Sequence, residues 1–480
     1  MRHLVIVGGG IAGLAAAFFA RRHATQFELP LRVTLLEAHD RLGGKVGTRR
    51  RDGFVLEAGP DGFVPHKPAA LALVQSLGLA PRLLRSNDQH RGIAFVRGGR
   101  AVPLPRGMEL LAPPRAAALL RSPLLSWRGK LRLLAERWVP AGRSDQDLSI
   151  AAFVRRRCGT EVLERIAEPL LSSLHVGDIE RMSLHACCAS LAALEQRHGS
   201  LTRAAAVRAE RAGSLGTPTF WSLRNGMAEV VDALEQCLGT ESLHRGCAAT
   251  GLGRAPAGRF RLATGQGPLA AGAVVLAMPA AAAATLLRRA MPMLACGLCG
   301  LRTASVAVVS LGFGPSAAPS PTGFGFFAPR REGLRVLGGT WTSVKFSHRA
   351  PDGCFLARLF LGGAHAEQLV GLGDKELERV AREDLRIVTG VRAAPMLTQV
   401  ERWPAGYPQY DVGHAGRVHA LEAACPPGLF LAGSAFHGVG VPDCIASGAR
   451  AAAAAVGHLA PGASAVATTP ADEVPASILG

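Results

Sequence analysis

The chain has 480 residues, 48% of them hydrophobic, which excludes a wholly disordered protein and predicts two or three packed units. Its 54 Lys and Arg against 36 Asp and Glu give a formal net charge of +18, which suits anionic lipid, an acidic substrate or nucleic acid. Nucleic acid is not expected, because the chain has two Tyr and no module that combines aromatic and basic residues for RNA binding. No apolar run reaches the roughly 18 to 20 residues of a membrane span, and no signal peptide is recognisable. We therefore expect a cytoplasmic protein, free or resting on the cytoplasmic face of a membrane.

The first elements predict a βαβ unit that binds a dinucleotide. Residues 3–8 form an apolar run typical of a buried strand, 11–23 an Ala-rich helix, and 32–37 the next strand. Gly8-Gly9-Gly10-Ile11-Ala12-Gly13 satisfies GxGxxG in the strand–loop–helix context that makes this motif informative. Its glycines let the backbone approach a pyrophosphate at the helix N-terminus, and Glu37 can accept from ribose hydroxyls. The alternative is a purely structural strand–helix turn.

The later elements alternate between helical and β-rich regions. A helix is expected over 68–85, several basic, leucine-rich helices over 86–210, and a strand meander that ends in a buried strand over 220–290. Residues 300–365 are β-rich, and 374–389 is predicted to be a helix. The last ordered unit is a strand at 428–433, a glycine loop and a helix at 445–458, and 461–480 is expected to be a loose tail.

The run after Glu37 distinguishes FAD from NAD, because regular β-α repeats do not follow. Arg41-Leu42-Gly43-Gly44 and then Glu57-Ala58-Gly59-Pro60 resemble the FAD family of amine oxidases, phytoene desaturases and protoporphyrinogen oxidases. In that family RxGG covers the phosphates and the Gly-Pro loop approaches the flavin. The C-terminal loop from Gly433 to Gly440 belongs to the same resemblance. The expected FAD-binding residues are Gly8, Gly9, Gly10, Ile11, Ala12, Gly13, Glu37, Arg41, Gly43, Gly44, Gly59, Pro60, Asp61, Gly62, Ala249, Trp403, Gly433, Ser434, Val439, Gly440 and Val441.

Two C-terminal segments resemble one branch of that family, the protoporphyrinogen and coproporphyrinogen oxidases of haem synthesis. Gly438-Val-Gly-Val-Pro-Asp-Cys-Ile445 is similar to the GVxVxDCI signature of the branch, and Trp403 to His414 is similar to its RWPxxxPQYxxGH segment. The resemblance extends from residue 4 to about 458. It implies an α/β fold with a Rossmann-like FAD-binding domain (1–85, 211–290 and 415–460), a mixed-sheet substrate domain (291–414) and a helical membrane-associating domain (86–210).

The helical insertion at 86–210 is expected to contact a membrane. Its segment PLLSWRGKLRLLAERWVP can place Leu, Trp127 and Trp138 on one side and Arg on the other, a pattern typical of an interfacial helix on anionic lipid. The alternative is an ordinary amphipathic helix that covers a core. Ferrochelatase is a further candidate partner, and an oligomer is left open.

The reaction that the resemblance implies is a six-electron oxidation of protoporphyrinogen IX to protoporphyrin IX, with O2 reoxidising the flavin. Coproporphyrinogen III is the alternative substrate. The macrocycle is flat and apolar, so holding it against the cofactor can suffice without an acid–base triad. An amine oxidase or carotenoid desaturase shares the N-terminal motifs but does not account for GVGVPDCI. A flavin-free escort protein of the same fold is the non-enzymatic alternative, and the glycine loops at both ends argue against it.

The resemblance also implies the residues that contact substrate. Phe324 and Phe327 lie where the family sandwiches the macrocycle, and Phe360 lies where a large apolar residue faces it. Lys67 matches a bacterial lysine suited to a propionate, whereas the position of a mitochondrial arginine is occupied by Val64. Ser173 replaces a common glycine whose carbonyl lies near the macrocycle.

Other reactive residues are given structural roles. His175 could act as a base but is expected to be structural. Lys345 could correspond to the flavin-proximal lysine of amine oxidases, yet its surroundings are similar to those of the porphyrinogen oxidases. Cys296-Gly-Leu-Cys299 has no second pair of ligands at zinc spacing, so no metal site is expected.

Overall fold

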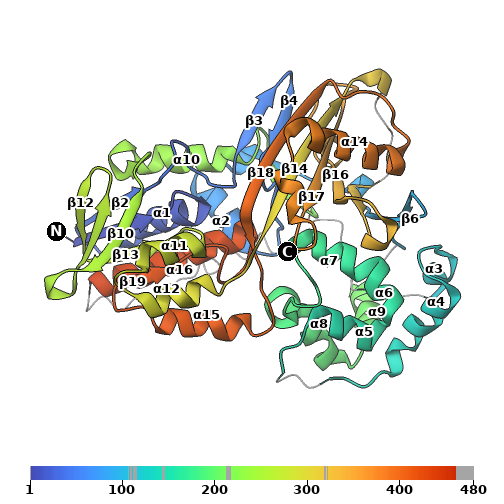
Figure 1. The fold of residues 1–480 in the computed structure, drawn as a ribbon, viewed down its shortest axis with the longest axis horizontal. Helices are drawn as coiled ribbons and strands as arrows, with labels where there is room; N and C mark the ends of the chain where they lie inside the picture. Colours follow the sequence, from blue (N-terminus) through green and yellow to red (C-terminus); the bar gives the residue numbers. More distant parts are fainter. Residues whose placement is uncertain are drawn as a thin grey trace.

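The computed structural model describes residues 2–105, 108, 111, 116–142, 146–211, 218–317, 321 and 323–460. Figure 1 shows a unit that contains both ends of the described chain beside a second sheet, with a group of helices below that sheet. The mixed α/β class predicted from the sequence is confirmed. The expected tail at 461–480 lies outside the described residues.

The first unit is built on a parallel sheet of five strands, in the order β19-β13-β1-β2-β9. The predicted βαβ unit forms as expected, and Val7 pairs with both Leu36 and Leu276. The strands are β1 (Arg2–Val7), β2 (Leu31–Leu36), β9 (Leu243–His244), β13 (Ala273–Leu276) and β19 (Leu429–Leu431). Because their interior residues are fully buried, both faces of the sheet must be covered.

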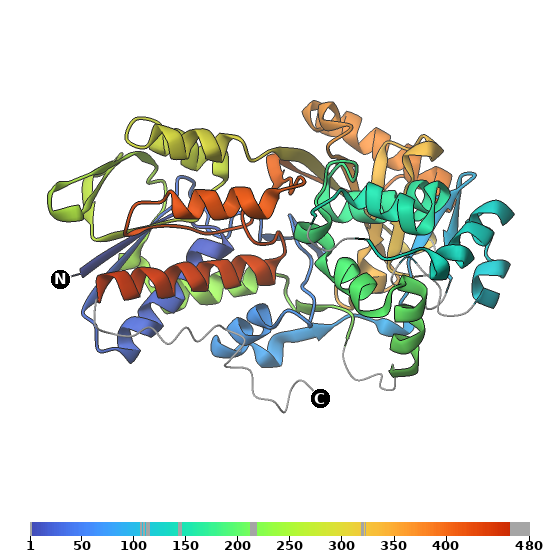
Figure 2. The ribbon, with the colours of Figure 1, turned by 90° about the horizontal axis from the view of Figure 1, so that it is seen from below.

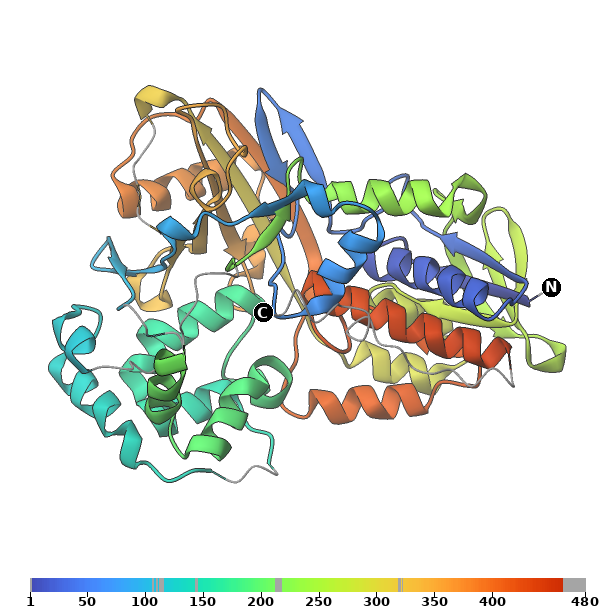
Figure 3. The same ribbon diagram turned by 180° about the vertical axis from the view of Figure 1, so that it is seen from behind.

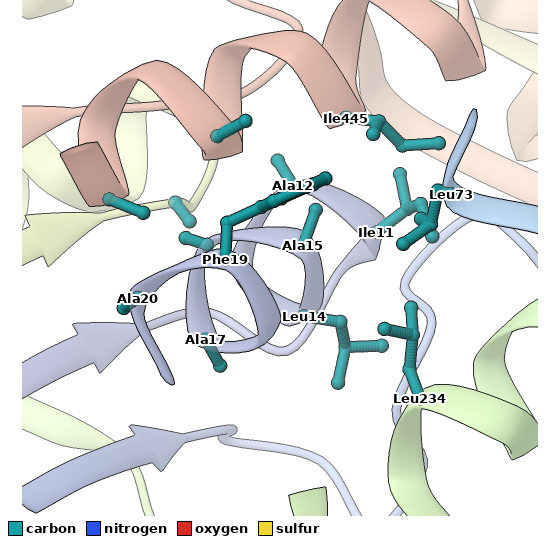
Figure 4. Packing of buried hydrophobic residues seen from close by; sticks show 14 of the residues in the cluster. Ile11, Ala12, Leu14, Ala15, Ala17, Phe19, Ala20, Leu73, Leu234 and Ile445 are labelled. Carbon is teal, nitrogen blue, oxygen red and sulfur yellow. The ribbon is translucent and has the colours of Figure 1, made fainter. Parts of the chain in front are cut away.

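Helices cover one face of this sheet. Figure 4 shows the side chains of α1 packed between α16, α2 and α10, with Ile11, Leu14 and Phe19 in the cluster. The helices are α1 (Ile11–Gln26), α2 (Pro68–Ser76), α10 (Ala228–Leu238) and α16 (Val441–Leu459). The expected helix over 68–85 was too long: it ends at Ser76, because Gly78 adopts a φ of +71°.

The opposite face is covered by a small antiparallel sheet and three helices. A core cluster that joins Val5 and Val274 to Phe260 and Leu298 fills the space between them. The elements are β10 (Ala249–Arg254), β11 (Phe260–Thr264), β12 (Gly267–Ala271), α11 (Ala280–Leu287), α12 (Pro292–Cys299) and α15 (His414–Ala423). Figure 2 shows this unit turned by 90°.

The second sheet has seven strands in the order β18-β14-β17-β16-β15-β6-β7. It comprises β18 (Leu397–Pro408), β14 (Thr303–Phe313), β17 (Phe355–Gly362), β16 (Val336–Trp341), β15 (Gly325–Phe327), β6 (Ala94–Arg97) and β7 (Arg100–Pro103). The helix α14 (Asp374–Thr389) has the bounds predicted from the sequence, and it covers one face of this sheet. The expectation of helices from residue 86 was wrong for 94–103, because β6 pairs with β15 and extends this sheet.

The remaining helices form a separate cluster below the second sheet (Figures 1 and 3). They are α3 (Ala116–Arg121), α4 (Trp127–Leu134), α5 (Ile150–Cys158), α6 (Thr160–Val162), α7 (Glu168–His175), α8 (Leu184–His198) and α9 (Leu201–Arg211). A fully buried ion pair joins them: Arg157 Nε donates to Glu136, whose carboxylate also accepts from Ser200 Oγ at 2.7 Å. A buried pair of this kind requires such extra hydrogen bonds to offset its desolvation. The short elements β3 (Thr48–Arg51), β4 (Phe54–Glu57), β5 (Leu83–Arg85), β8 (Trp221–Leu223) and α13 (Thr342–Lys345) lie between the units.

Candidate active site

The loop between β1 and α1 is shaped for close approach of a ligand to the backbone. Gly8 adopts a φ of +110°, and a Cβ on Gly13 would lie 1.9 Å from the Gly8 carbonyl oxygen. A Cβ on Gly10 would meet no atom within 4 Å, so the backbone here faces open space. Gly10 caps α1 without a side-chain hydrogen bond, which leaves the first N–H groups of the helix available for an anion.

Glu37 lies at the end of β2 and hydrogen-bonds to this loop. Its Oε2 accepts from the Gly9 N–H at 2.7 Å, and its Oε1 accepts from the His39 N–H at 2.9 Å. Oε1 also lies 2.8 Å from His39 Nδ1, whereas Oε2 retains a second lone pair that can accept from a ribose hydroxyl.

The second glycine loop, residues 41–46, packs directly on the first. The Gly43 N–H donates to the Gly9 carbonyl at 2.8 Å. Arg41 donates to the carbonyls of Leu42 and Val46 at 3.0 and 2.9 Å, so its guanidinium holds the loop in shape. Its predicted contact with the phosphates stays a prediction.

The third loop, from Ala58 to Gly62, is held by side chains of the second sheet. Trp403 Nε1 donates to the Ala58 carbonyl at 2.9 Å, and Arg358 donates to the Gly59 carbonyl at 2.5 Å. Asp61 forms an ion pair with Lys345 at 3.0 Å. Burial alone would raise the pKa of Asp61, but the charges of Lys345 and Arg358 hold it below its usual value. Lys345 thus supports the Gly59-Pro60 loop.

The fourth loop, Gly433 to Gly440, leads into α16 and is clamped by Tyr410. The Tyr410 hydroxyl donates to the Ser434 carbonyl and accepts from the Gly438 N–H, both at 2.7 Å. The Tyr410 ring stacks on His414, with centroids 3.9 Å apart. Sequence reasoning did not assign this role to Tyr410, although it lies in the quoted PQY segment.

The first and fourth loops meet because α1 and α16 cross closely. A Cβ on Gly448 would lie 2.2 Å from the Ala12 carbonyl oxygen, and a Cβ on Gly433 would lie 3.9 Å from Ala12 Cβ. The first turn of α1 therefore packs on the third turn of α16, and the fourth loop begins beside Ala12. This arrangement fits an extended dinucleotide with a pyrophosphate. Val441 starts α16, while Ala249 lies at the start of β10 and is half-buried.

Lys45 is a site residue that sequence reasoning missed. Its Cε lies 3.3 Å from the position of a Cβ on Gly406, and its charge acts on the Cys444 thiol. Burial lowers the pKa of Lys45, and no described carboxylate forms an ion pair with it. Its place directly after Arg41-Leu42-Gly43-Gly44 was the available signal.

Two predicted substrate residues lie around one backbone carbonyl on the second sheet. Ser173 Oγ donates to the Leu337 carbonyl at 2.8 Å, and Leu337 and Phe360 both pack against the cluster of Val176, Ala304 and Val306. The hydroxyl of Ser173 is therefore turned to β16 rather than left free.

Of the other two predicted phenylalanines, Phe327 lies on the same face of the sheet as Phe360, whereas Phe324 lies on the side of Lys345. Phe327 and Phe360 both pair with Gly338 of β16 and so share one face of the sheet, with no side chain between them. Phe327 packs on Phe95, with centroids 5.8 Å apart. Phe324 contacts Phe220 at 6.4 Å, on the side of Lys345.

Lys67 lies at the start of α2 and pairs with Asp443 of α16. Its Nζ lies 2.8 and 2.9 Å from the two carboxylate oxygens, and almost half of its side chain is exposed. His175 lies close enough to sense both charges, and burial together with Lys67 lowers the pKa of His175 to about 4. The imidazole is therefore neutral at pH 7.

The next three observations concern the cysteines, metal ligands and helix lengths of the described residues. All ten cysteines are free, and Cys296 and Cys299 are exposed on α12. Within the described ranges no group of His, Cys, Asp and Glu is arranged to hold a metal ion. No helix among the described residues has the length and apolar character needed to cross a bilayer.

The chain is similar to known flavoproteins over nearly its whole length. The sequence profile of the family described as flavin containing amine oxidoreductase matches residues 11–456. The coproporphyrinogen III oxidase of Bacillus subtilis is 35% identical over 469 residues, which cover 95% of this chain and 98% of the relative. The human protoporphyrinogen oxidase is 31% identical, covering 95% of this chain and 98% of the relative. A crystal structure of a protein from Exiguobacterium superposes with a TM-score of 0.84 at 33% identity, covering 94% of this chain and 98% of the other.

Proposed function

The chain belongs to the family of flavin containing amine oxidoreductases and is an FAD-dependent oxidoreductase, and from this premise we propose that it oxidises coproporphyrinogen III to coproporphyrin III in haem synthesis. The observation that carries the choice of substrate is the 35% identity, over 95% of the chain, to a relative named coproporphyrinogen III oxidase. A second relative of that name, from Propionibacterium freudenreichii, is also 35% identical. Protoporphyrinogen IX is the second candidate, supported by the human relative at 31%.

The four loops supply the cofactor site in this proposal. When bound, FAD supplies the group that accepts a hydride, and O2 reoxidises the reduced flavin. The N-termini of α1 and α16 stabilise the pyrophosphate, and Glu37 binds the ribose. Lys345 and Arg358 fix the Gly59-Pro60 loop through Asp61 and the Gly59 carbonyl, which keeps the isoalloxazine pocket rigid.

The second sheet and α7 supply the substrate site. Phe327 and Phe360 are half-buried, and their apolar side chains exclude water and orient the macrocycle. Lys67 binds a propionate, and Asp443 holds the ammonium in place when no substrate is bound. The same roles divide the chain into an FAD-binding unit, a substrate-binding sheet and a helical unit.

Contact with an anionic membrane is the remaining part of the proposal. Trp127 and Leu131 lie four residues apart on α4 and expose 65% and 63% of their surface, and Trp138 exposes 72%. Arg137 lies over the Trp138 ring at 5.2 Å, so cation and aromatic can enter a headgroup region together.

Vesicle co-sedimentation tests the membrane contact. The Trp127→Ala/Trp138→Ala variant should lose binding to phosphatidylglycerol vesicles, whereas Met293→Ala, which removes an exposed side chain from α12, should keep it. Equal binding by the two variants would eliminate this surface.

Turnover tests the reaction itself. The FAD-loaded protein should convert coproporphyrinogen III in air to the fluorescent porphyrin and release hydrogen peroxide. A requirement for a different electron acceptor would remove O2 from the proposal.

A further inference from the structure

An open pocket of about 480 Å³ lies away from the four glycine loops. It is bounded by the turn that leads into α8, by the start of β14 and by the segment from Gln409 to Arg417. None of its lining residues is among those predicted for FAD or substrate. The segment is fixed on both sides: the Gln409 N–H donates to the Arg302 carbonyl at 2.8 Å, and the Val412 N–H donates to the Arg181 carbonyl at 2.9 Å.

Three arginines line this pocket, and their charges are not equally compensated. Arg302 forms a two-bond pair with Asp411, at 2.7 and 2.8 Å, and hydrogen bonding from Asp411 raises the pKa of Arg302. Arg417 donates only to the backbone carbonyls of Asp411 and Val412, each at 3.0 Å, which do not neutralise its charge. Arg181 reaches the same Asp411 at only 3.4 Å.

The other lining carboxylate does not correct this imbalance. Glu180 pairs with Arg155, outside the pocket, at 2.5 Å. Arg181 therefore shares Asp411 with Arg302, and Arg417 has no carboxylate partner among the described residues. Guanidinium groups in this position bind the oxygens of phosphate through paired N–H donors.

Gln409 closes the inner wall of the pocket. Its side chain is buried, and its Nε2 donates to the carbonyls of His175 and Tyr407 at 3.3 and 3.2 Å. Its Oε1 is buried without a donor among the described residues. This oxygen lies 2.6 Å from the position of a Cβ on Gly177, so it faces the protein interior and not the pocket.

We propose that the pocket lined by Arg181 and Arg417 is a binding site for a phosphate dianion, either free phosphate or a phosphate monoester. The two guanidiniums bind the phosphoryl oxygens, and the volume admits the small organic group of a monoester. This site is separate from the FAD pyrophosphate site and does not depend on which substrate the protein oxidises.

Isothermal titration of the FAD-loaded protein tests the proposal. The titrants are inorganic phosphate and glycerol phosphate, added separately in a buffer of low ionic strength, because exposed charges are screened by salt. We expect saturable binding of at least one titrant, with one molecule per chain, and at least a tenfold loss in Arg181→Gln/Arg417→Gln. Binding of phosphate alone identifies the free ion as the ligand, and binding of both identifies a monoester site.

Three further variants keep the result interpretable. Lys67→Gln and Arg386→Gln, each of which removes a cation elsewhere, should bind within twofold of the unmodified protein. Arg181→Gln alone, which removes an exposed side chain, serves if the double variant does not fold. No saturable binding of either titrant, unchanged affinity in the Arg181 and Arg417 variants, or a loss that follows Lys67→Gln instead would overturn the proposal.

Discussion

Tyr410→Phe is expected to weaken FAD binding by loosening the loop from Gly433 to Gly440. The variant removes one hydroxyl that serves two backbone groups, the Ser434 carbonyl and the Gly438 N–H, each at 2.7 Å. A net hydrogen bond contributes about 0.5–1.5 kcal/mol, and a buried group left without a partner costs about 1–3 kcal/mol. Because both backbone groups are only half-buried, water can replace part of this bonding, and we expect a total of about 1–3 kcal/mol.

The loss should appear as an increase of about 5- to 150-fold in the FAD dissociation constant. It is measured by titrating deflavinated protein with FAD and following flavin fluorescence. The chain contains one other tyrosine, Tyr407, whose hydroxyl lies 3.4 Å from the Leu174 carbonyl and does not contact the loop. Tyr407→Phe is therefore the matched control. Dissociation constants within twofold of each other for the two variants would refute the role of Tyr410.

Three further predictions concern other parts of the site. Lys67→Ala should raise KM for the porphyrinogen more than it lowers kcat, and an unchanged KM would remove Lys67 from the substrate site. Gly448→Ala places a Cβ 2.2 Å from the Ala12 carbonyl and should destabilise the protein by about 1–3 kcal/mol in thermal unfolding. A Cβ on Gly416, in α15, would meet no atom within 4 Å, so Gly416→Ala is the control and should not destabilise the protein. Equal melting temperatures for the Gly448 and Gly416 variants would contradict the prediction. His175 keeps a pKa of about 4 in the fold but about 6.5 when unfolded, so the free energy of unfolding should fall as the pH drops from 6.5 to 4. His175→Gln should lose less stability than the unmodified protein in urea unfolding between pH 7 and pH 5, and an equal loss would refute the assignment.

The first glycine loop could be predicted from the sequence because its determinants are local. A buried strand, a run of glycines and an Ala-rich helix follow one another within 23 residues, and their geometry is set by backbone conformation. Gly8 requires a positive φ, and Gly13 allows the helix to approach the Gly8 carbonyl. The same local logic predicted the bounds of α14 from its helical periodicity.

The supports of the other loops could not be predicted, because their partners are distant in the chain. Tyr410 contacts groups 24 and 28 residues away, Arg358 reaches Gly59 across 299 residues, and Lys67 pairs with Asp443 across 376. Pairs of this kind depend on how whole sheets and helices are placed. The strands at 94–103 were missed for the same reason, since β6 is stabilised by pairing with β15.

The sequence could not decide whether Phe324, Phe327 and Phe360 belong to the core or to the substrate site. Each phenylalanine is equally compatible with a packed core and with a wall of the substrate site, since burial stabilises it in both. The register that places Phe327 and Phe360 on either side of Gly338 follows from strand pairing alone. Their contact with the macrocycle stays a prediction.

The most direct test of the central claim is an aerobic assay of the FAD-loaded protein with coproporphyrinogen III and protoporphyrinogen IX, followed by porphyrin fluorescence. We predict that the protein accelerates porphyrin formation over the rate in its absence, with the higher kcat/KM for coproporphyrinogen III. Failure to accelerate either oxidation, together with turnover of an amine or a polyene, would contradict it.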